Sequence, residues 1–483
     1  MIILIVVAVA LLVGLAFRIA ALRVIPRNRR PQTAKAWLLA IFFIPFLGSL
    51  AFLIFGSHRL PRKRRPKQRE ISDYILETTE GIDLVTRDDT WPPWFGQVVE
   101  LNRTLGAMPL VGGNRAEMWA DDDVSLAEMT AAVRAAARLI HCEFYILSLD
   151  ESTADFFDAL EEAIQRGVTV RVLLDHLGNV PYPGFRRTTR RLTRMGADWH
   201  LMLPVQPLRG RYQRPDLRNH RKLLVIDGRI AFTGSQNVIE TGYQRRRNHR
   251  RGLHWKDYMA RFEGPIVAGI DALFVTDWYA ETDELLEREV PSALEQRNKG
   301  GMDCQVVPSG PGFPGENNLR LFNALVYAAR QRIVLVSPYF VPDDSMLYAI
   351  TTAAQSGIDV QLFVSEVGDQ FFAFHAQRSY YEVLLKAGVR IFLYAAPTIL
   401  HAKHMSFDDD VSVIGSSNMD MRSFTLDAEI SIMVRDRDFL RRLRELEDSY
   451  RESSRELTLE TWMNRPLIRK MLDNMARLTA ALQ

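Results

Sequence analysis

Two stretches of the chain repeat one arrangement of reactive side chains. Residues 219–237 read NHRKLLVIDGRIAFTGSQN, and residues 401–418 read HAKHMSFDDDVSVIGSSN. Both fit the template His, one residue, Lys, four residues, Asp, six residues, Gly-Ser, one residue, Asn. A second copy of so long a template arises by chance far less often than one short match. The duplication therefore indicates two half-sites.

The side chains of the template suit chemistry at a phosphodiester. An imidazole can act as nucleophile or as general acid and base, and an ammonium binds a phosphate oxygen as a point charge. Residues i and i+2 of a strand share one face, so His220 lies beside Lys222 and His401 beside Lys403. Two facing half-sites would line one cationic cavity rich in hydrogen-bond donors. The candidate phosphate-binding residues at the Gly-Ser-x-Asn strand ends are Asn237, Asn418, Ser235 and Ser416.

Apolar runs flank the aspartate of the first motif. Residues 223–226 and 230–232 are predicted to be buried strands around a turn at Asp227-Gly228. Asp227 and Asp408 complete the motifs and so belong to the candidate catalytic set. Their position at turns indicates a structural rather than a chemical role.

The paired motifs resemble those of the phospholipase D superfamily. Nearly the whole chain, including its apolar N-terminus, resembles the bacterial cardiolipin synthases of that superfamily. Residues 337–343 are similar to the family's Pro-Tyr-Phe-x-Pro segment, and residues 418–424 to its Asn-x-Asp-x-Arg-Ser stretch. The first motif departs from the family, because Val-Ile-Glu-Thr-Gly-Tyr follows Asn237 where many cardiolipin synthases have Asp-Glu-Tyr nearby. This departure leaves the acceptor lipid open.

The resemblance implies a two-step displacement through a phosphohistidine. It makes His220 the nucleophile and His401 the acid and base, although the residue pattern alone does not decide between two nearly symmetric half-sites. A carboxylate usually holds the second nitrogen of such a histidine, and we expect Asp257 to orient His220 and Glu429 to orient His401. The catalytic set is then His220, Lys222, Asp227, His401, Lys403 and Asp408. Lysines and asparagines stabilise the phosphate charge in this scheme, so no metal and no other cofactor is expected.

The expected reaction is transfer of a phosphatidyl group between two phosphatidylglycerol molecules, giving cardiolipin and glycerol. The alternative is a hydrolytic membrane-bound phospholipase D or phosphodiesterase. A net charge of +3 is too small to indicate a nucleic-acid partner, and a catalytically silent scaffold would not need two complete motifs. The expected partners are phosphatidylglycerol and other anionic membrane lipids. Phosphatidylethanolamine as a substrate and a homo-oligomer are left open.

Two uncharged runs at the N-terminus, residues 1–17 and 36–56, are each near the length that crosses a hydrocarbon core. The first lacks a preceding basic region and a clear cleavage site, which favours an anchor over a signal peptide. A buried core helix is the alternative for each run. We expect a membrane-embedded chain in the bacterial inner (plasma) membrane, with a multi-pass or hairpin anchor and cytoplasmic catalytic domains.

Both flanks of the second run are basic, which a simple two-span hairpin cannot satisfy under the positive-inside rule. One hypothesis is a re-entrant segment that turns at Pro45 and Gly48, with both flanks in the cytoplasm. The arginines either attract anionic headgroups or act only as topology determinants. These basic residues are Arg18, Arg23, Arg27, Arg29, Arg30 and Lys35 before the run, and Arg59, Arg62, Lys63, Arg64, Arg65, Lys67 and Arg69 after it.

An internal repeat extends beyond the motifs. Residues 137–145 correspond to 331–339, and residues 167–175 correspond to 357–365, with helical patterns between them. This order predicts an α/β fold: two pseudo-symmetric phospholipase D-type α/β/α domains preceded by an N-terminal α-helical membrane region. The expected boundaries are 1–70 for the membrane anchor, 71–112 for a linker, 113–298 for the first domain, and 299–483 for the second domain with its C-terminal helix.

Several other stretches carry weaker expectations. Cys142 and Cys304 lie in apolar strand-like runs, so we expect buried free thiols. Trp91-Pro92-Pro93-Trp94 is either a wedge at the membrane interface or part of a packed linker. An insert within residues 203–219 is either a basic lip over the site or a solvated loop, and it holds Arg209, Arg211, Arg214 and Arg218.

The C-terminal tail, residues 459–483, has an amphipathic helical pattern. A helix packed on the domain is preferred here over docking on a membrane surface. The apolar residues that fall largely on one face are Trp462, Leu467, Met471, Met475, Leu478 and Leu482.

Overall fold

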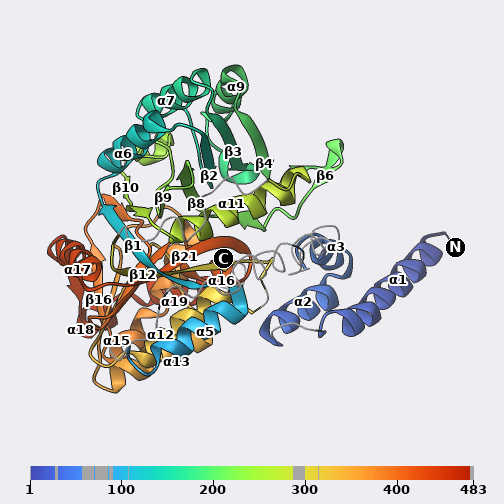
Figure 1. Ribbon diagram of the computed structural model, residues 1–483. Helices are drawn as coiled ribbons and strands as arrows, with labels where there is room; N and C mark the ends of the chain where they lie inside the picture. The colour runs from blue at the N-terminus through green and yellow to red at the C-terminus, as the bar shows by residue number, and fades with distance from the viewer. Residues whose placement is uncertain are drawn as a thin grey trace. The chain divides into compact units, whose positions relative to one another are not determined.

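The computed structural model describes residues 2–27, 31–56, 70, 85, 91–106, 108–286, 300–313 and 315–478 (Figure 1). The chain divides into two compact units. One unit contains Met1–Leu60 with Arg214–Asp216, and the other contains Pro61–Gln213 with Leu217–Gln483.

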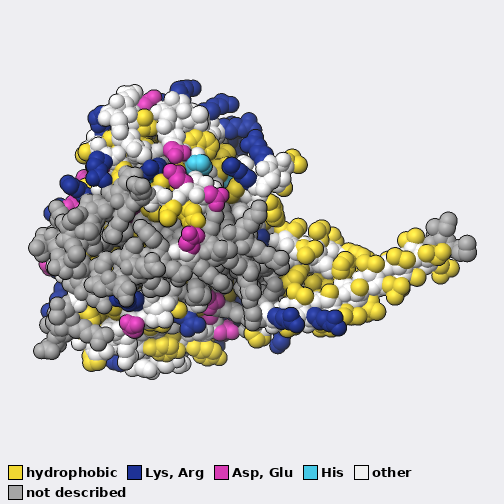
Figure 2. All heavy atoms as spheres, turned by 45° about the vertical axis from the view of Figure 1, so that its right-hand side comes forward, with side chains coloured by type: hydrophobic (Ala, Val, Ile, Leu, Met, Phe, Trp, Pro, Cys, Tyr) yellow, Lys and Arg dark blue, Asp and Glu magenta, His cyan; other side chains and the backbone are white. Residues whose placement is uncertain are grey.

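The N-terminal unit is helical. Helix α1 (Ile2–Val24) has 23 residues and contains the segment Leu4–Val24, which is long and apolar enough to cross a membrane. At 1.5 Å per residue it measures about 35 Å, against a hydrocarbon core of about 30 Å. Most of its hydrophobic side chains are exposed, and Figure 2 shows hydrophobic side chains gathered over the N-terminal helices. An exposed apolar helix of this length is typical of a membrane anchor.

The second apolar run forms two helices, α2 (Pro31–Phe43) and α3 (Pro45–Phe55). Helix α2 ends before Pro45 because proline has no backbone N–H to donate to the preceding turn. Ile44, which lies between the two helices, is outside the helical region at φ −131°. The predicted single run at 36–56 is therefore interrupted. With 13 and 11 residues, the two helices measure about 20 and 16 Å, which is shorter than a hydrocarbon core.

Helices α2 and α3 pack closely on each other. The rings of Trp37 and Phe52 are 5.4 Å apart, and a Cβ on Gly48 would lie 2.6 Å from the Ala40 carbonyl oxygen. Arg18 of α1 donates to the Phe42 carbonyl oxygen at 3.0 and 3.2 Å, where α2 ends. The close approach at Gly48 makes the pair a helical hairpin. Arg29, Arg30 and the basic residues between positions 59 and 69, which flank the second apolar run in the sequence, lie outside the described residues.

The other unit is built from two similar halves. The first half, with the helix that precedes it, contains α5 (Phe95–Gly106), β1 (Leu110–Trp119), α6 (Asp122–Ala135), β2 (Leu139–Phe144), α7 (Ala154–Gln165), β3 (Thr169–Asp175), α8 (His176–Asn179), α9 (Phe185–Met195), β4 (Asp198–Met202), β5 (Val205–Gln206), β6 (Arg211–Tyr212), β7 (Arg218–Asn219), β8 (Lys222–Ile226), β9 (Ile230–Gly234), α10 (Arg246–Arg250), β10 (His254–Lys256), β11 (Met259–Glu263) and α11 (Ile266–Thr282).

The second half contains β12 (Met302–Ser309), α12 (Asn317–Ala328), β13 (Arg332–Val336), β14 (Phe340–Val341), α13 (Asp344–Gln355), β15 (Asp359–Ser365), α14 (Phe371–Arg378), α15 (Tyr381–Ala387), β16 (Arg390–Tyr394), β17 (Thr398–Leu400), β18 (His404–Phe407), β19 (Val411–Gly415), β20 (Met419–Asp420), α16 (Met421–Thr425), β21 (Asp427–Arg435), α17 (Arg437–Glu452), β22 (Ser454–Leu457), α18 (Leu459–Met463) and α19 (Leu467–Arg477).

One mixed sheet runs through both halves. The strand order is β4-β3-β2-β8-β9-β11-β1 in the first half and β16-β15-β13-β18-β19-β21-β12 in the second, with β22 beyond β16. In each half the first three strands pair in parallel and the next four pair antiparallel. Strands β1 and β12 join the halves edge to edge, with Leu110 opposite Gln305. The order confirms the predicted pair of pseudo-symmetric α/β halves.

Helices cover both faces of this sheet. Helices α11 and α17 share one core cluster with strands of both halves. On the opposite face, α6 and α7 pack on the first half, while α12, α13 and α15 pack on the second. Figure 1 shows α6, α7 and α9 gathered around the first half. Cys142 and Cys304 are buried free thiols in strands, as predicted.

The stretch before the first domain is packed rather than extended. Helix α5 contributes Phe95 and Val98 to the core of the second half, and the rings of Trp91 and Trp94 lie 5.0 and 5.9 Å from that of Phe95. This favours the packed-linker interpretation of the tryptophans. Strand β1 begins at Leu110, within the stretch predicted as linker.

The tail helix packs on the domain, as predicted, through contacts of α19 with α14. The face that packs is not the apolar one. Trp462 is buried, but Leu467, Met471, Met475 and Leu478 are exposed. The buried positions of α19 are instead Asp473 and Ala476. Leu482 lies outside the described residues.

The motif aspartates hold turns between strands. Asp227, at φ 52°, accepts hydrogen bonds from the backbone N–H groups of residues 137–139 at 2.8–2.9 Å. Asp408, at φ 47°, accepts from residues 330–332 at 2.7–2.9 Å. Each carboxylate fixes the start of the neighbouring strand, β2 or β13. These contacts favour a structural role for residues that complete a catalytic motif.

Substituting Asp227→Ala should destabilise the fold without a change in the chemistry of the site. It leaves three backbone N–H groups without their acceptor and puts alanine at positive φ, so the free energy of unfolding should fall by about 1–3 kcal/mol. Asp227→Asn keeps one acceptor oxygen and should lose less. Thermal unfolding of the full chain in detergent measures the effect. An unchanged melting temperature with lost activity would instead assign Asp227 a chemical role.

Candidate active site

Each motif histidine is attached to a short strand that pairs with the other half. Strand β7, just before His220, runs parallel to β21, and the His220 N–H donates to the Ala428 carbonyl at 2.8 Å. Strand β17, just before His401, runs parallel to β10, and the His401 N–H donates to the Lys256 carbonyl at 2.8 Å. The two crossings bring each histidine to a carboxylate of the other half.

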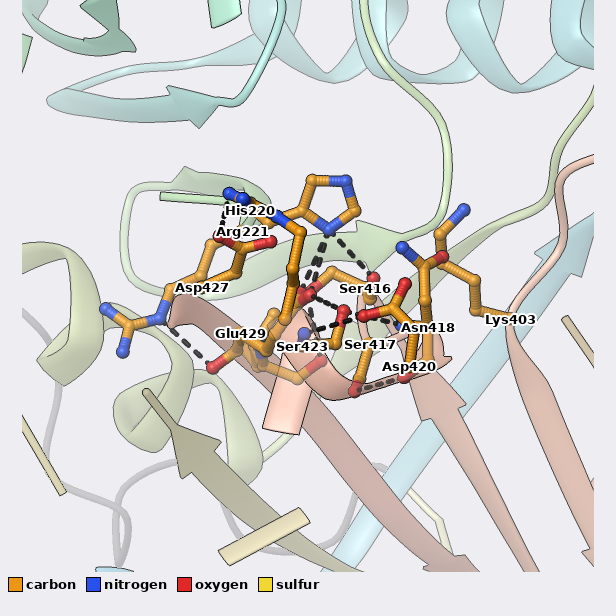
Figure 3. A network of polar contacts seen from close by, with 12 residues as sticks. His220, Arg221, Lys403, Ser416, Ser417, Asn418, Asp420, Ser423, Asp427 and Glu429 are labelled. Atoms are coloured by element: carbon orange, nitrogen blue, oxygen red, sulfur yellow. Dashed lines mark hydrogen bonds and ion pairs between the residues drawn. The ribbon is translucent and has the colours of Figure 1, made fainter. Parts of the chain in front are cut away.

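Glu429 of β21 holds His220. The His220 Nδ1 lies 3.0 and 3.1 Å from the two carboxylate oxygens and 3.1 Å from the Ser416 carbonyl (Figure 3). Ser416 and Ser423 donate their hydroxyls to Glu429. Since all neighbours of Nδ1 are acceptors, Nδ1 carries the proton and Nε2 carries the lone pair. Figure 3 shows the second ring nitrogen directed away from this network.

Asp257, at the end of β10, holds His401 in the same way. The distance from His401 Nδ1 to Asp257 Oδ1 is 2.7 Å. The backbone N–H of Asp257 donates to Asp122 at 3.2 Å. The His401 ring, with its hydrogen bond, and then Lys403 lower the pKa of Asp257 more than burial raises it. Asp257 is therefore an anionic partner for His401.

The predicted pairing of these carboxylates was wrong. We expected Asp257 beside His220 and Glu429 beside His401, each within its own half. The structure has the opposite pairing, because β7·β21 and β10·β17 cross between halves. Each half alone therefore holds an incomplete site.

The two lysines are buried and lie near each other's half-site. Lys222 and Lys403 each donate to the carbonyl of their own motif histidine at 2.5 Å. Burial lowers the pKa of Lys222 to about 7 and that of Lys403 to about 8, while Glu429 and Asp257 oppose the shifts. Each lysine also lowers the pKa of the other half's histidine. The site thus concentrates positive charge where water is excluded.

Burial also keeps the imidazoles neutral. It lowers the pKa of His220 well below the ordinary value, with Lys222 and Lys403 adding to the effect. It lowers the pKa of His401 to about 4, against the opposing effect of Asp257. Burial raises the pKa of Glu429 to about 7, despite Lys222 and its two serine donors. A neutral imidazole with a free Nε2 is the form that can attack phosphorus.

The Gly-Ser-x-Asn segments are placed differently from our expectation. The Ser416 hydroxyl is committed to Glu429, and the Ser235 hydroxyl accepts from the Tyr258 N–H at 3.0 Å and supports Asp257. Both serines therefore orient carboxylates instead of presenting a free hydroxyl to phosphate. The glycines before them permit the close strand contact, since a Cβ on Gly415 would lie 2.2 Å from the Ile430 carbonyl oxygen.

The asparagines of the two motifs, Asn237 and Asn418, differ in their hydrogen-bond partners. Asn237 accepts from the Ile146 N–H at 3.2 Å and donates to the Tyr243 hydroxyl at 2.9 Å. The Asn418 side chain is buried, and no donor within the described part of the chain reaches its Oδ1. The amide oxygen of Asn418 therefore remains open to a hydrogen-bond donor of a bound group.

Sequence reasoning missed two positioning residues. The Tyr258 hydroxyl accepts from the Gly415 N–H at 2.7 Å and donates to the Lys403 carbonyl at 3.1 Å, so β11 fixes the second motif. Ser423 donates to Glu429 at 2.8 Å. The Asn-x-Asp-x-Arg-Ser stretch contains Ser423 and could have indicated it, whereas no pattern marks Tyr258.

The insert within residues 203–219 is neither a basic lip over the site nor a solvated loop along its whole length. Arg209 and Arg211 are exposed beside the β5–β6 hairpin. Arg218 is instead buried, and its Nη1 lies 3.1 Å from Asp175 of β3. That ion pair anchors the strand leading to His220.

Comparison with known proteins gives the family of the chain. A family model described as "Cardiolipin synthase, PLD-like domain" matches residues 129–278 and 323–449. A second model, "Phospholipase_D-nuclease N-terminal", matches residues 3–57. These matches cover both halves of the sheet and the N-terminal helices.

Curated relatives extend the match over almost the whole chain. Cardiolipin synthase A of Pectobacterium carotovorum is 31% identical over 470 residues, covering 94% of this chain and 93% of that protein. Cardiolipin synthase A of Yersinia pseudotuberculosis is 32% identical over 468 residues, with the same coverage. The crystal structure of a phosphatidylserine synthase from Haemophilus influenzae shares the fold, with a TM-score of 0.59, 15% identity, and coverage of 80% of this chain and 99% of that one. The chain therefore belongs to the cardiolipin synthase family with phospholipase D-like domains, a family of phosphatidyltransferases.

Proposed function

We propose that this enzyme transfers a phosphatidyl group from one phosphatidylglycerol to another, forming cardiolipin and releasing glycerol. The observation that carries the proposal is the pair of carboxylate-held histidines, one from each motif, beside two buried lysines. The names of the relatives support the choice of lipid substrates.

The first step uses His220 as the nucleophile. Its Nε2 attacks the phosphorus of phosphatidylglycerol, and the bond from phosphorus to the headgroup glycerol oxygen breaks. Binding of the phosphodiester anion favours the imidazolium form of His401, which then donates its Nε2 proton to that oxygen, so glycerol leaves as a neutral alcohol and His401 is left neutral. Glu429 stabilises the His220 ring as it gains positive charge.

The second step reverses the proton transfer. His401 accepts the proton of a headgroup hydroxyl on a second phosphatidylglycerol, and that oxygen attacks the phosphorus. The bond from phosphorus to His220 Nε2 breaks and cardiolipin is formed. Lys222, Lys403 and Asn418 stabilise charge on the non-bridging oxygens in both steps. Water in place of the second lipid would give phosphatidic acid.

The N-terminal unit would hold the enzyme at the bacterial inner membrane. In this proposal α1 crosses the bilayer, while the α2–α3 hairpin enters from the cytoplasmic side and returns to it. The interruption at Ile44–Pro45 and the short helices support a re-entrant hairpin. Both basic flanks and the catalytic unit would then lie in the cytoplasm, as the positive-inside rule requires.

The proposed reaction is tested with purified full-length protein in phosphatidylglycerol vesicles containing EDTA, followed by lipid mass spectrometry. Cardiolipin and free glycerol should appear in equal amounts. His220→Ala and His401→Ala should each lower the rate by at least about a thousandfold, because one loses the nucleophile and the other the proton carrier. Phosphatidic acid without cardiolipin would identify a hydrolase instead.

The pH dependence should show an alkaline limb set by the lysines. Their cationic forms bind the phosphodiester, and those forms are lost in the free enzyme as pH rises through about 7 to 8. The value of kcat/KM should therefore fall above pH 8, while kcat should hold to higher pH because the bound anion favours the ammonium form. Lys222→Arg, which stays charged at the position with the lower of the two lysine pKa values, should move the limb upward. A kcat/KM that stays flat to pH 10 would contradict this assignment.

The topology is tested by labelling with an impermeant thiol reagent in intact cells. Arg30→Cys and Arg65→Cys place single reactive thiols on either side of the hairpin, while native Cys142 and Cys304 are buried. Both positions lie outside the described residues. Neither thiol should be labelled until the membrane is opened. Free labelling of one position from outside would exclude the re-entrant hairpin.

A further inference from the structure

Helix α19 presents its apolar side chains outward. The exposed fractions are 81% for Leu467, 72% for Ile468, 59% for Met471, 58% for Met475 and 84% for Leu478, which follows the helix. Residues spaced in this way form one continuous stripe on a helix. Such a stripe normally faces the core, so its outward orientation needs a cause.

The cause is a buried carboxylate on the opposite side of the helix. Asp473 is 1% exposed, and its oxygens lie 2.7 Å from His375 Nδ1 and 2.6 Å from Arg465 Nη1. Arg378 lies 3.4 Å away. A buried carboxylate held by such partners cannot be brought to the surface without separating it from these partly buried basic side chains. These contacts fix the rotation of α19 and keep its apolar stripe outward.

Helix α14 packs against α19 and adds two exposed apolar side chains. It carries His375, the partner of Asp473, and begins with Phe371 and Phe372, which are 57% and 59% exposed. We call the stripe of α19 together with Phe371 and Phe372 the docking patch.

The docking patch adjoins the candidate active site. Asp369, two residues before Phe371, accepts from the Tyr339 hydroxyl at 2.9 Å. Asp369 is also close enough to oppose the lowering of the Lys403 pKa. A lipid lying at the patch would thus be near residues that surround Lys403 of the candidate active site.

The exposed charges of α19 are of one sign. Within α19 the basic residues are Arg469, Lys470 and Arg477, and the only acidic residue is the buried Asp473. A hydrophobic stripe edged by basic residues matches the interface of a bilayer that contains anionic lipids. A second copy of the same patch would bring like charges together.

We propose that the docking patch inserts into the surface of a bilayer containing anionic phospholipid. This inference goes beyond the proposed function, because it assigns a membrane contact to the catalytic unit itself, separate from the N-terminal helices. The apolar side chains would enter about 5–10 Å, to the boundary of headgroups and acyl chains, with the basic residues at headgroup level. The active site would then receive lipid without its complete extraction into water.

The test uses the full chain in nanodiscs of phosphatidylglycerol and phosphatidylcholine. Met471→Cys carries an environment-sensitive fluorophore, and Asp438→Cys, on an 89% exposed side chain of α17, is the matched control. Cys142 and Cys304 are buried and should not react. Lipids with brominated acyl chains should quench the label at 471 several-fold more than the label at 438. Quenching at 471 no greater than at 438 would overturn the proposal.

Two further measurements show whether the patch inserts along its length and whether a second copy of the chain occupies it instead. A label at Leu467→Cys should be quenched like that at 471, and quenching at neither position would overturn the docking patch as a whole. Energy transfer between labelled copies without quenching by brominated lipid would identify a second copy as the occupant and also overturn the proposal. Quenching requires no turnover, so a failure of the proposed function would appear separately, in the products of the vesicle assay.

Discussion

The site depends on two hydrogen bonds that cross between the halves of the chain, from His220 to Glu429 and from His401 to Asp257. Each bond fixes a tautomer and aims Nε2 of its histidine. Neither can form within one half, because the carboxylate reaches its histidine only through the pairing of β7 with β21 or of β10 with β17. The edge-to-edge joining of β1 and β12 holds the two crossings in register.

Burial makes the lysines and histidines of the site reactive, and it makes the folded free enzyme less stable. Burial lowers the pKa of both lysines and both histidines. Repulsion by Lys403 lowers the pKa of Lys222 further, and both lysines lower the pKa values of the histidines. Glu429 and Asp257 offset part of that repulsion. A phosphodiester anion between the lysines would offset more, so binding of the substrate relieves an unfavourable arrangement present in the free enzyme. The same arrangement makes stabilisation of phosphate charge available without reorganisation.

The sequence predicted much of this arrangement, and the failures share one physical origin. Strand alternation placed His220 beside Lys222, and the internal repeat predicted two α/β halves, because both depend on neighbours along the chain. The exchange of carboxylates was missed because it depends on strand pairing that brings together residues 209 and 144 positions apart. The outward stripe of α19 was missed for the same reason, since Asp473 is held by His375 and Arg378 of another helix. Ser235 and Ser416 were predicted to bind phosphate, because the sequence pattern does not show that Asp257 and Glu429 are their hydrogen-bond partners.

The most direct test of the crossed pairing is to trap the covalent intermediate and map it. Full-length His401→Ala is incubated with a phosphatidyl ester of an acidic phenol, which leaves without a proton, and the modified peptide is identified by mass spectrometry at neutral pH. The crossed pairing predicts a phosphatidyl group on His220. It also predicts that Glu429→Gln in the same background slows formation of this adduct at least about tenfold, whereas Asp257→Asn has little effect. An adduct on another residue, or a larger effect of Asp257→Asn than of Glu429→Gln, would contradict it.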